Sequence, residues 1–194
     1  PGPKNLKTWL GATFLSLCGW KVAGHIPKDA KWVAIGCPHT SNWDFPFMIT
    51  ASWVMGVRLR WMGKASLFKG PLGKLMLALG GVPVDRTKSN DMVQQMVDWY
   101  AKSDALVVAI PPSGTRSFRD HWKTGFYYIA QKAGVPIGLG ILDFDKKQAG
   151  FSGQLNPSGD MEKDFELLRE FYEPIGGKIP ANKNTIQVRP KKND

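Results

Sequence analysis

The sequence predicts one α/β domain, in which helices flank a central, largely parallel β-sheet. Short β-rich runs alternate with helical runs along most of the chain, and this order is typical of parallel sheets. Glycine and proline mark the joints between the runs, as at Gly56, Gly80-Gly81 and Pro111-Pro112. The 194 residues suit a single domain whose core needs no disulfide or metal to fold.

Residue type and apolar spacing set the expected positions of the strands and helices. Runs rich in β-branched and aromatic residues predict strands at 32–36, 57–62, 81–85, 105–110 and 136–143. Apolar residues three and four positions apart predict helices at 6–19, 42–55, 71–79, 89–102, 123–133 and 160–172. The polar, basic end of the chain, 176–194, is expected to fray as a tail.

The first helix has the composition of a segment that lies on a membrane. No run of 18 or more apolar residues exists, so no part of the chain is expected to span a bilayer. One face of the helix is mostly apolar and holds Leu6, Trp9, Leu10, Thr13, Phe14 and Leu17. Lysines flank the helix at both ends. We therefore expect residues 1–22 to form an amphipathic membrane-surface helix. A helix packed on the core is the alternative, because Leu15 and Cys18 lie on other faces.

The charge of the chain favours an anionic partner. The net charge is +10, and residues 1–159 alone carry 19 basic and 9 acidic side chains. Such a field suits a phosphorylated substrate, an anionic membrane or a nucleic acid. Eight tryptophans and ten phenylalanines could stack on bases. However, the chain has no basic run, zinc spacing or RNA-binding fingerprint, so we expect no nucleic-acid partner.

The few cysteines and histidines predict neither disulfides nor metal. Cys18 and Cys37 form no spaced pattern and are expected to be free thiols, either in a reducing compartment or without a redox role. Three scattered histidines add no ligand set, so no metal and no cofactor is expected. Cys37 could accept an acyl group, but its place at the end of an apolar strand favours a buried, structural thiol.

The most informative local pattern is CPHTSNWDFP at 37–46. His39 and Asp44 are five residues apart, which puts them about 140° apart on a helix and on opposite faces of a strand. They meet only if a turn intervenes, and Thr40-Ser41-Asn42 supplies residues suited to one. The carboxylate could then hold one nitrogen of the imidazole and leave the other free as a base. By spacing alone, a loop histidine beside an unrelated helix-terminal aspartate remains the alternative.

Five segments of the chain, taken together, resemble a known family. HTSNWD (39–44) resembles the H-x4-D motif of the glycerolipid acyltransferases, which include 1-acylglycerol-3-phosphate O-acyltransferases and PlsC-like lysophospholipid acyltransferases. The remaining segments follow in the family's order: WMGKASLF (61–68), GGVPVDR (80–86), PPSGTRS (111–117) and GVPI (134–137). The resemblance spans about 37–140 and implies an acyltransferase domain over 23–175.

The resemblance implies a reaction and a role for each site residue. His39 would remove the proton from an acceptor hydroxyl as it attacks the thioester of acyl-CoA or acyl-carrier protein, and Asp44 would orient His39. Arg86 and Arg116 would bind the acceptor phosphate, with Lys64 beside them. Ser113, Gly114 and Thr115 would let backbone N–H groups approach the anion. The acceptor would be a lysophospholipid, and the enzyme would sit peripherally on the cytoplasmic face of a membrane.

One residue departs from the family's pattern. The third motif usually reads P-E-G-T-R-S, whereas this chain has Ser113 in place of the glutamate. The alternative function is therefore a non-catalytic lipid- or anion-binding relative that is disabled at Ser113. Ser113 itself is not expected to be a nucleophile, because Pro111 and Thr115 stand where the G-x-S-x-G elbow needs glycine.

Overall fold

A computed structural model describes residues 5–84 and 89–189, and it has the expected α/β architecture. Strands in this part of the chain form a single seven-stranded sheet, in the order β1-β7-β6-β2-β5-β3-β4. Their bounds are β1 Lys21–His25, β2 Lys31–Cys37, β3 Leu59–Lys64, β4 Gly81–Val84, β5 Leu106–Ala109, β6 Ile137–Asp143 and β7 Gln148–Leu155. All five expected strands are confirmed, while β1 and β7 were not expected.

The core of the sheet is parallel. Strands β6, β2, β5, β3 and β4 all run in one direction, so their carboxyl ends lie at one edge of the sheet. Strand β7 is antiparallel to β6, and β1 is parallel to β7. We call the edge at which the five parallel strands end the carboxyl edge, and the other the amino edge. Ligand sites in open α/β sheets usually lie at the carboxyl edge.

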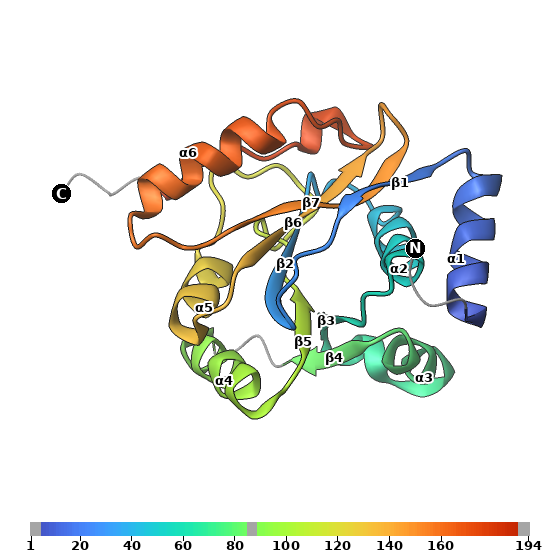
Figure 1. Ribbon diagram of the computed structural model, residues 1–194, viewed down its shortest axis with the longest axis horizontal. Coiled ribbons are helices and arrows are strands. Elements are labelled where there is room, and N and C mark those ends of the chain that lie inside the picture. The colour runs from blue at the N-terminus through green and yellow to red at the C-terminus, as the bar shows by residue number, and fades with distance from the viewer. Residues whose placement is uncertain (1–4, 85–88, 190–194) are drawn as a thin grey trace.

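All six expected helices are present and cover both faces of the sheet. They are α1 Leu6–Leu17, α2 Asp44–Met55, α3 Gly70–Ala78, α4 Ser89–Lys102, α5 Gly125–Ala133 and α6 Met161–Tyr172. Figure 1 shows α4, α5 and α6 on one side of the sheet and α1 and α2 on the other, with α3 beside β4. No helix in the described ranges is both long enough and apolar enough to cross a bilayer.

Strand β2 shows why the sheet is buried on both faces. Val33 and Ile35 join the cluster under α4, α5 and α6, whereas Trp32 and Ala34 join the cluster under α2. This alternation follows from the two-residue period of a strand. Burial of both faces explains why the strand reads as a continuous apolar run rather than an alternating one.

Helix α1 packs on α2 rather than on the sheet, and only part of its predicted face is exposed. Gly11 permits this close approach, because a Cβ there would lie 2.7 Å from the carbonyl oxygen of Thr50. Leu15 is also buried, on a different face from Leu6 and Trp9, which are exposed. One side of the helix therefore packs against the protein, and another side exposes apolar side chains to solvent.

The expectation that the chain frays after 176 is wrong for the part of it that the structure describes. Ile186 is buried in the larger core cluster, and Arg169 Nε donates to its carbonyl oxygen at 3.0 Å. The backbone N–H of Ile179 donates to Thr40 Oγ1 at 3.3 Å. A few apolar side chains and hydrogen bonds to the preceding loops therefore hold a segment whose composition is polar. The last five residues, 190–194, lie outside the described residues.

Candidate active site

The His39–Asp44 pair lies at the carboxyl edge, where β2 ends. The chain leaves β2 at Cys37, turns through 38–43, and enters α2 at Asp44. This turn brings His39 Nδ1 to 2.9 Å from Asp44 Oδ2. The side chain of His39 is 24% exposed and that of Asp44 is 2% exposed. Asp44 thus fixes the imidazole from inside the protein, while part of the ring stays accessible to solvent.

The turn also fixes the carboxylate of Asp44. Its Oδ2 accepts hydrogen bonds from the backbone N–H of Thr40 at 2.8 Å and of Ser41 at 3.0 Å. The hydroxyl of Ser41 donates to Oδ1 at 3.4 Å. With Asp44 as acceptor, His39 Nδ1 carries the donated proton, and Nε2 keeps its lone pair for another partner. This arrangement equips His39 to act as a base.

The loop after β5 holds Ser113, Gly114 and Thr115 in a tight turn. The backbone N–H of Gly114 donates to the Pro111 carbonyl oxygen at 3.0 Å, and Gly114 adopts a left-handed φ of 64°. The Ser113 hydroxyl is buried and donates to the Thr115 carbonyl oxygen at 2.6 Å. The N–H of Gly114 is therefore already used within the turn and is not free for an anion.

Arg116 connects this loop to the turn that carries His39. Its guanidinium donates to Asn42 Oδ1, across 74 residues of sequence. From the sequence, Asn42 was expected only as a residue of the turn, and this contact was not predicted. The adjacency of β2 and β5 in the sheet brings the two loops together, and residue type at Asn42 carries no signal of it. Arg116 is exposed, so its remaining donors face solvent beside the His39 turn.

Lys123 is a further cation beside this loop, and it was not predicted from the sequence. Its Cδ, Cε and Nζ lie within 3.3 Å of the position that a Cβ on Gly114 would occupy. Its backbone N–H donates to the Pro112 carbonyl oxygen at 2.9 Å. The residue thus lies over the turn in which Ser113 replaces the expected glutamate. Nothing in its sequence position, ten residues beyond Ser113, indicated this.

Lys64 and Arg86 complete the set of predicted site residues. Lys64 is exposed at the last position of β3, which pairs with β5, so it lies at the same edge as Arg116. No contact links it to His39 within 5–84 and 89–189. Arg86 lies outside the described residues, two positions beyond the end of β4.

Cys37 also lies at this edge, but its thiol is buried and unreactive. The thiol is buried just before the His39 turn, and its burial raises its pKa far above the usual range for cysteine. A thiol held in its protonated form is a poor nucleophile. The interpretation of Cys37 as structural therefore agrees with its surroundings.

With this geometry in place, comparison with known proteins decides the family. The family model described as Acyltransferase matches residues 21–138, which is more than half of the chain. The chain belongs to the acyltransferase family. The matched region runs from β1 into β6 and includes the His39 turn, the Arg116 loop and the strands that carry them.

Two further proteins resemble this acyltransferase. A 1-acyl-sn-glycerol-3-phosphate acyltransferase from Haemophilus influenzae is 34% identical over 140 residues, covering 66% of this chain and 56% of the relative. The chain therefore spans little more than half of that relative's length. The crystal structure of PlsC from Thermotoga maritima, a 1-acyl-sn-glycerophosphate acyltransferase, superposes with a TM-score of 0.57 at 18% identity. The superposition covers 86% of this chain and 73% of the PlsC chain. At 18% identity it supports only the fold.

Proposed function

We propose that this acyltransferase moves a fatty acyl group from acyl-CoA or acyl-carrier protein to a hydroxyl of 1-acylglycerol-3-phosphate or a similar lysophospholipid. The observation that carries the proposal is the 2.9 Å contact between His39 Nδ1 and Asp44 Oδ2 at the carboxyl edge, beside a loop that presents Arg116. The name of the Haemophilus influenzae relative supports the choice of acceptor.

The pair can perform the chemistry without a covalent intermediate. His39 Nε2 takes the proton of the acceptor hydroxyl as that oxygen attacks the thioester carbon. The new C–O bond forms, the C–S bond breaks, and the leaving thiolate receives the proton from His39. Asp44 accepts from Nδ1 throughout and stabilises the positive imidazolium between the two transfers. A positioned base of this kind is typically worth about 10²–10⁴ in rate.

The acceptor phosphate would bind to cations at the same edge. Arg116 offers a planar fork that matches two phosphate oxygens, and Lys64 offers a point charge. We propose Arg86 as a third member from the motif resemblance. Ser113, Gly114 and Thr115 would shape the turn that presents Arg116, since the Ser113 hydroxyl and the Gly114 N–H both donate inside it.

A membrane surface would supply the lipid acceptor. Helix α1 turns Leu6, Trp9, Leu10 and Leu17 to solvent, and the chain carries a net charge of +10. Exposed apolar side chains beside basic ones favour the interface of an anionic membrane. We propose peripheral attachment to the cytoplasmic face.

The second candidate function is a lipid- or anion-binding relative that does not catalyse. It rests on Ser113, whose hydroxyl is buried and donates within its own loop. Thiol release from acyl-CoA separates the two candidates, because the enzyme releases thiol only when an acceptor is added. A panel of lysophospholipids, with products identified by mass spectrometry, would then name the acceptor. Thiol release at the uncatalysed rate with every acceptor, from both acyl-CoA and acyl-carrier protein, would favour the binding protein.

A further inference from the structure

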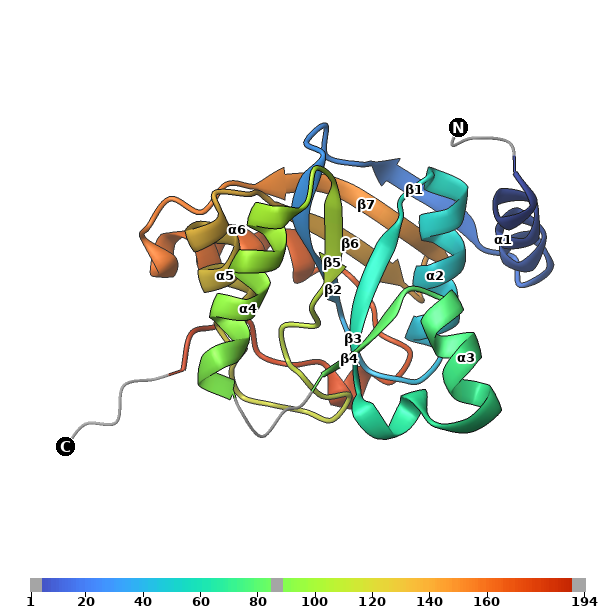
Figure 2. The same ribbon diagram turned by 90° about the horizontal axis from the view of Figure 1, so that it is seen from below.

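A pocket of about 440 Å³ opens at the amino edge of the sheet, across the sheet from His39. Its walls come from the first turn of α1, the end of α2, the start of β3 and the end of α3. Figure 2 shows α1 and α3 on the same side of the molecule, with α2 between α1 and β3. The proposed acyl transfer takes place at the other edge and leaves this pocket without a role.

The pocket is basic. Lys7, Arg58 and Arg60 line it, and no acidic side chain does so among the described residues. All three cations are exposed, and Lys7 Nζ lies 5.9 Å from the centre of a Trp53 ring. Three cations around one cavity, with no carboxylate to neutralise them, favour an anionic ligand.

The helix ends at the pocket do not cancel this charge. The carboxyl ends of α2 and α3 point toward it, and free carbonyls there would favour a cation. However, the Leu79 carbonyl oxygen accepts from Trp61 Nε1 at 3.0 Å, and the Trp53 carbonyl oxygen accepts from the N–H of Gly56 at 3.2 Å. Each helix end contributes only about half a negative charge, whereas the three side chains contribute one full positive charge each, so the field in the pocket stays positive.

The two helices whose ends wall the pocket indicate where the anion comes from. On α1, Leu6 and Trp9 are 71% and 63% exposed, and on α3 Leu75 and Leu77 are 52% and 48% exposed. A soluble phosphate compound would not need exposed apolar side chains on the helices beside its binding site. A phospholipid would, because its phosphate lies at the depth of the basic residues while its acyl chains meet the apolar ones.

We propose that this pocket binds the phosphate of an anionic phospholipid, and that it docks the side of the molecule bearing α1 and α3 on the membrane. The proposal rests on the membrane attachment proposed above and adds a defined site to it. The lipid bound here is a docking ligand and not the acceptor, because it lies at the edge opposite to His39.

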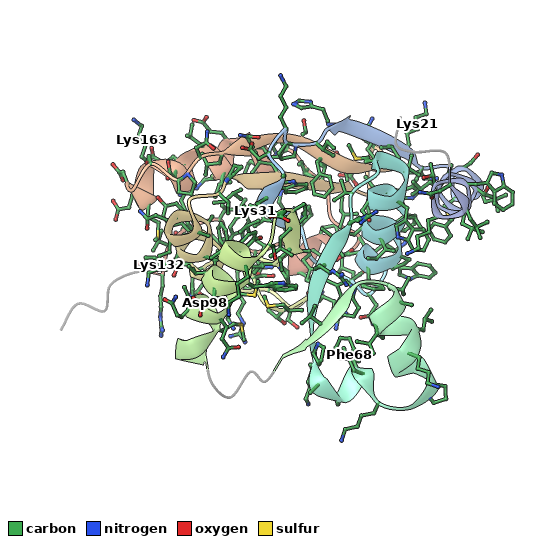
Figure 3. The ribbon with its side chains drawn as sticks, turned by 60° about the horizontal axis from the view of Figure 1, so that its bottom comes forward. Lys21, Lys31, Phe68, Asp98, Lys132 and Lys163 are labelled. Carbon is green, nitrogen blue, oxygen red and sulfur yellow. The ribbon has the colours of Figure 1, made fainter. Side chains whose placement is uncertain are left out.

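The test compares two variants with the same net charge. Arg58→Gln with Arg60→Gln removes two cations from the pocket, and Lys132→Gln with Lys163→Gln removes two from α5 and α6. Figure 3 shows Lys132 and Lys163 on the side away from α1. Co-sedimentation is measured with phosphatidylglycerol vesicles and with phosphatidylcholine vesicles. We expect the pocket variant to lose about 30-fold in partition coefficient to phosphatidylglycerol, since each cation near an anionic surface contributes about fivefold.

The controls separate the possible outcomes. The distant variant should lose less than about threefold, and Arg58→Lys with Arg60→Lys should bind nearly as well as the unchanged chain. All variants should keep the melting temperature, and inorganic phosphate at equal ionic strength should displace no more protein than chloride does. Equal losses in the two Gln variants would overturn the pocket but leave membrane attachment standing. Failure of the unchanged chain to bind phosphatidylglycerol would overturn both.

Discussion

Ser113 lies where the motif resemblance leads us to expect glutamate, and it is buried within its turn. A carboxylate there would add negative charge beside Lys123 and the Arg116 loop. We expect Ser113→Glu to raise acyl transfer to a glycerol-based acceptor and to weaken the binding of free phosphate. Turnover and phosphate affinity should be measured against Ser113→Gln, which has the same length without the charge. Lower turnover in the Glu variant alone would mean that serine is adapted to a different acceptor.

Arg116 hydrogen-bonds to Asn42 within the His39 turn. We expect Arg116→Ala to reduce kcat/KM for a phosphorylated acceptor by about 30-fold, equivalent to about 2 kcal/mol, because it removes a charged partner of the phosphate. Binding of the acyl donor should hardly change. Arg119→Ala is the matched control, since Arg119 is exposed and lies three residues further along. Equal kinetics of both variants would place the phosphate elsewhere.

Single residues were predictable where their chemistry is local. His39 and Asp44 could be paired from sequence because only the turn between them had to be inferred, and the structure brings them to 2.9 Å. Asn42 could not, because its contact with Arg116 depends on which strands are neighbours. Lys123 could not, because no local pattern predicts that the loop after β5 folds back on Gly114. The roles assigned to His39, Asp44 and Arg116 stay predictions until they are measured.

At the scale of elements, the segment after α6 supports the His39 turn. Asn182 Nδ2 donates to the Thr40 carbonyl oxygen at 3.3 Å, while Ile179 N–H donates to Thr40 Oγ1. The N–H of Thr40 in turn donates to Asp44. The chain from Ile179 to Asn182 thus positions Thr40, whose N–H in turn positions the Asp44 carboxylate.

Thr40→Val tests this support, because it removes the hydroxyl and keeps the shape. We expect kcat to fall several-fold with little change in KM, and the free energy of unfolding to fall by about 1 kcal/mol. Thr50→Val is the control, since it removes a threonine hydroxyl that donates to the Pro46 carbonyl oxygen inside α2. If both variants lose stability and neither loses turnover, the segment contributes to folding only.

The same segment shows why some elements escaped prediction. Its composition is polar, and no periodic pattern in its sequence predicts the hydrogen bonds to Thr40. Strand β7 was missed because Gly150 and Gly153 interrupt its apolar run, and β1 because it is a short, mostly exposed edge strand. The helices were predictable because their apolar spacing is a local property.

At the scale of the whole molecule, the parallel sheet gathers loops that are far apart in sequence. Strands β2, β5 and β3 are neighbours, so the loops carrying His39, Arg116 and Lys64 open at one edge. The alternation of strands and helices was enough to predict the fold class. It was not enough to predict the strand order, and so the neighbours of each loop came only from the structure.

The central claim is that His39 and Asp44 perform acyl transfer at this edge, and acceptor-dependent thiol release tests it most directly. The assay uses acyl-CoA or acyl-carrier protein, 1-acylglycerol-3-phosphate, and the unchanged chain beside His39→Ala and Asp44→Asn, each with an unchanged melting temperature. We predict that the unchanged chain releases thiol only with acceptor, and that both variants lose about 10²–10⁴ in kcat. Undiminished acceptor-dependent release by His39→Ala would contradict the account.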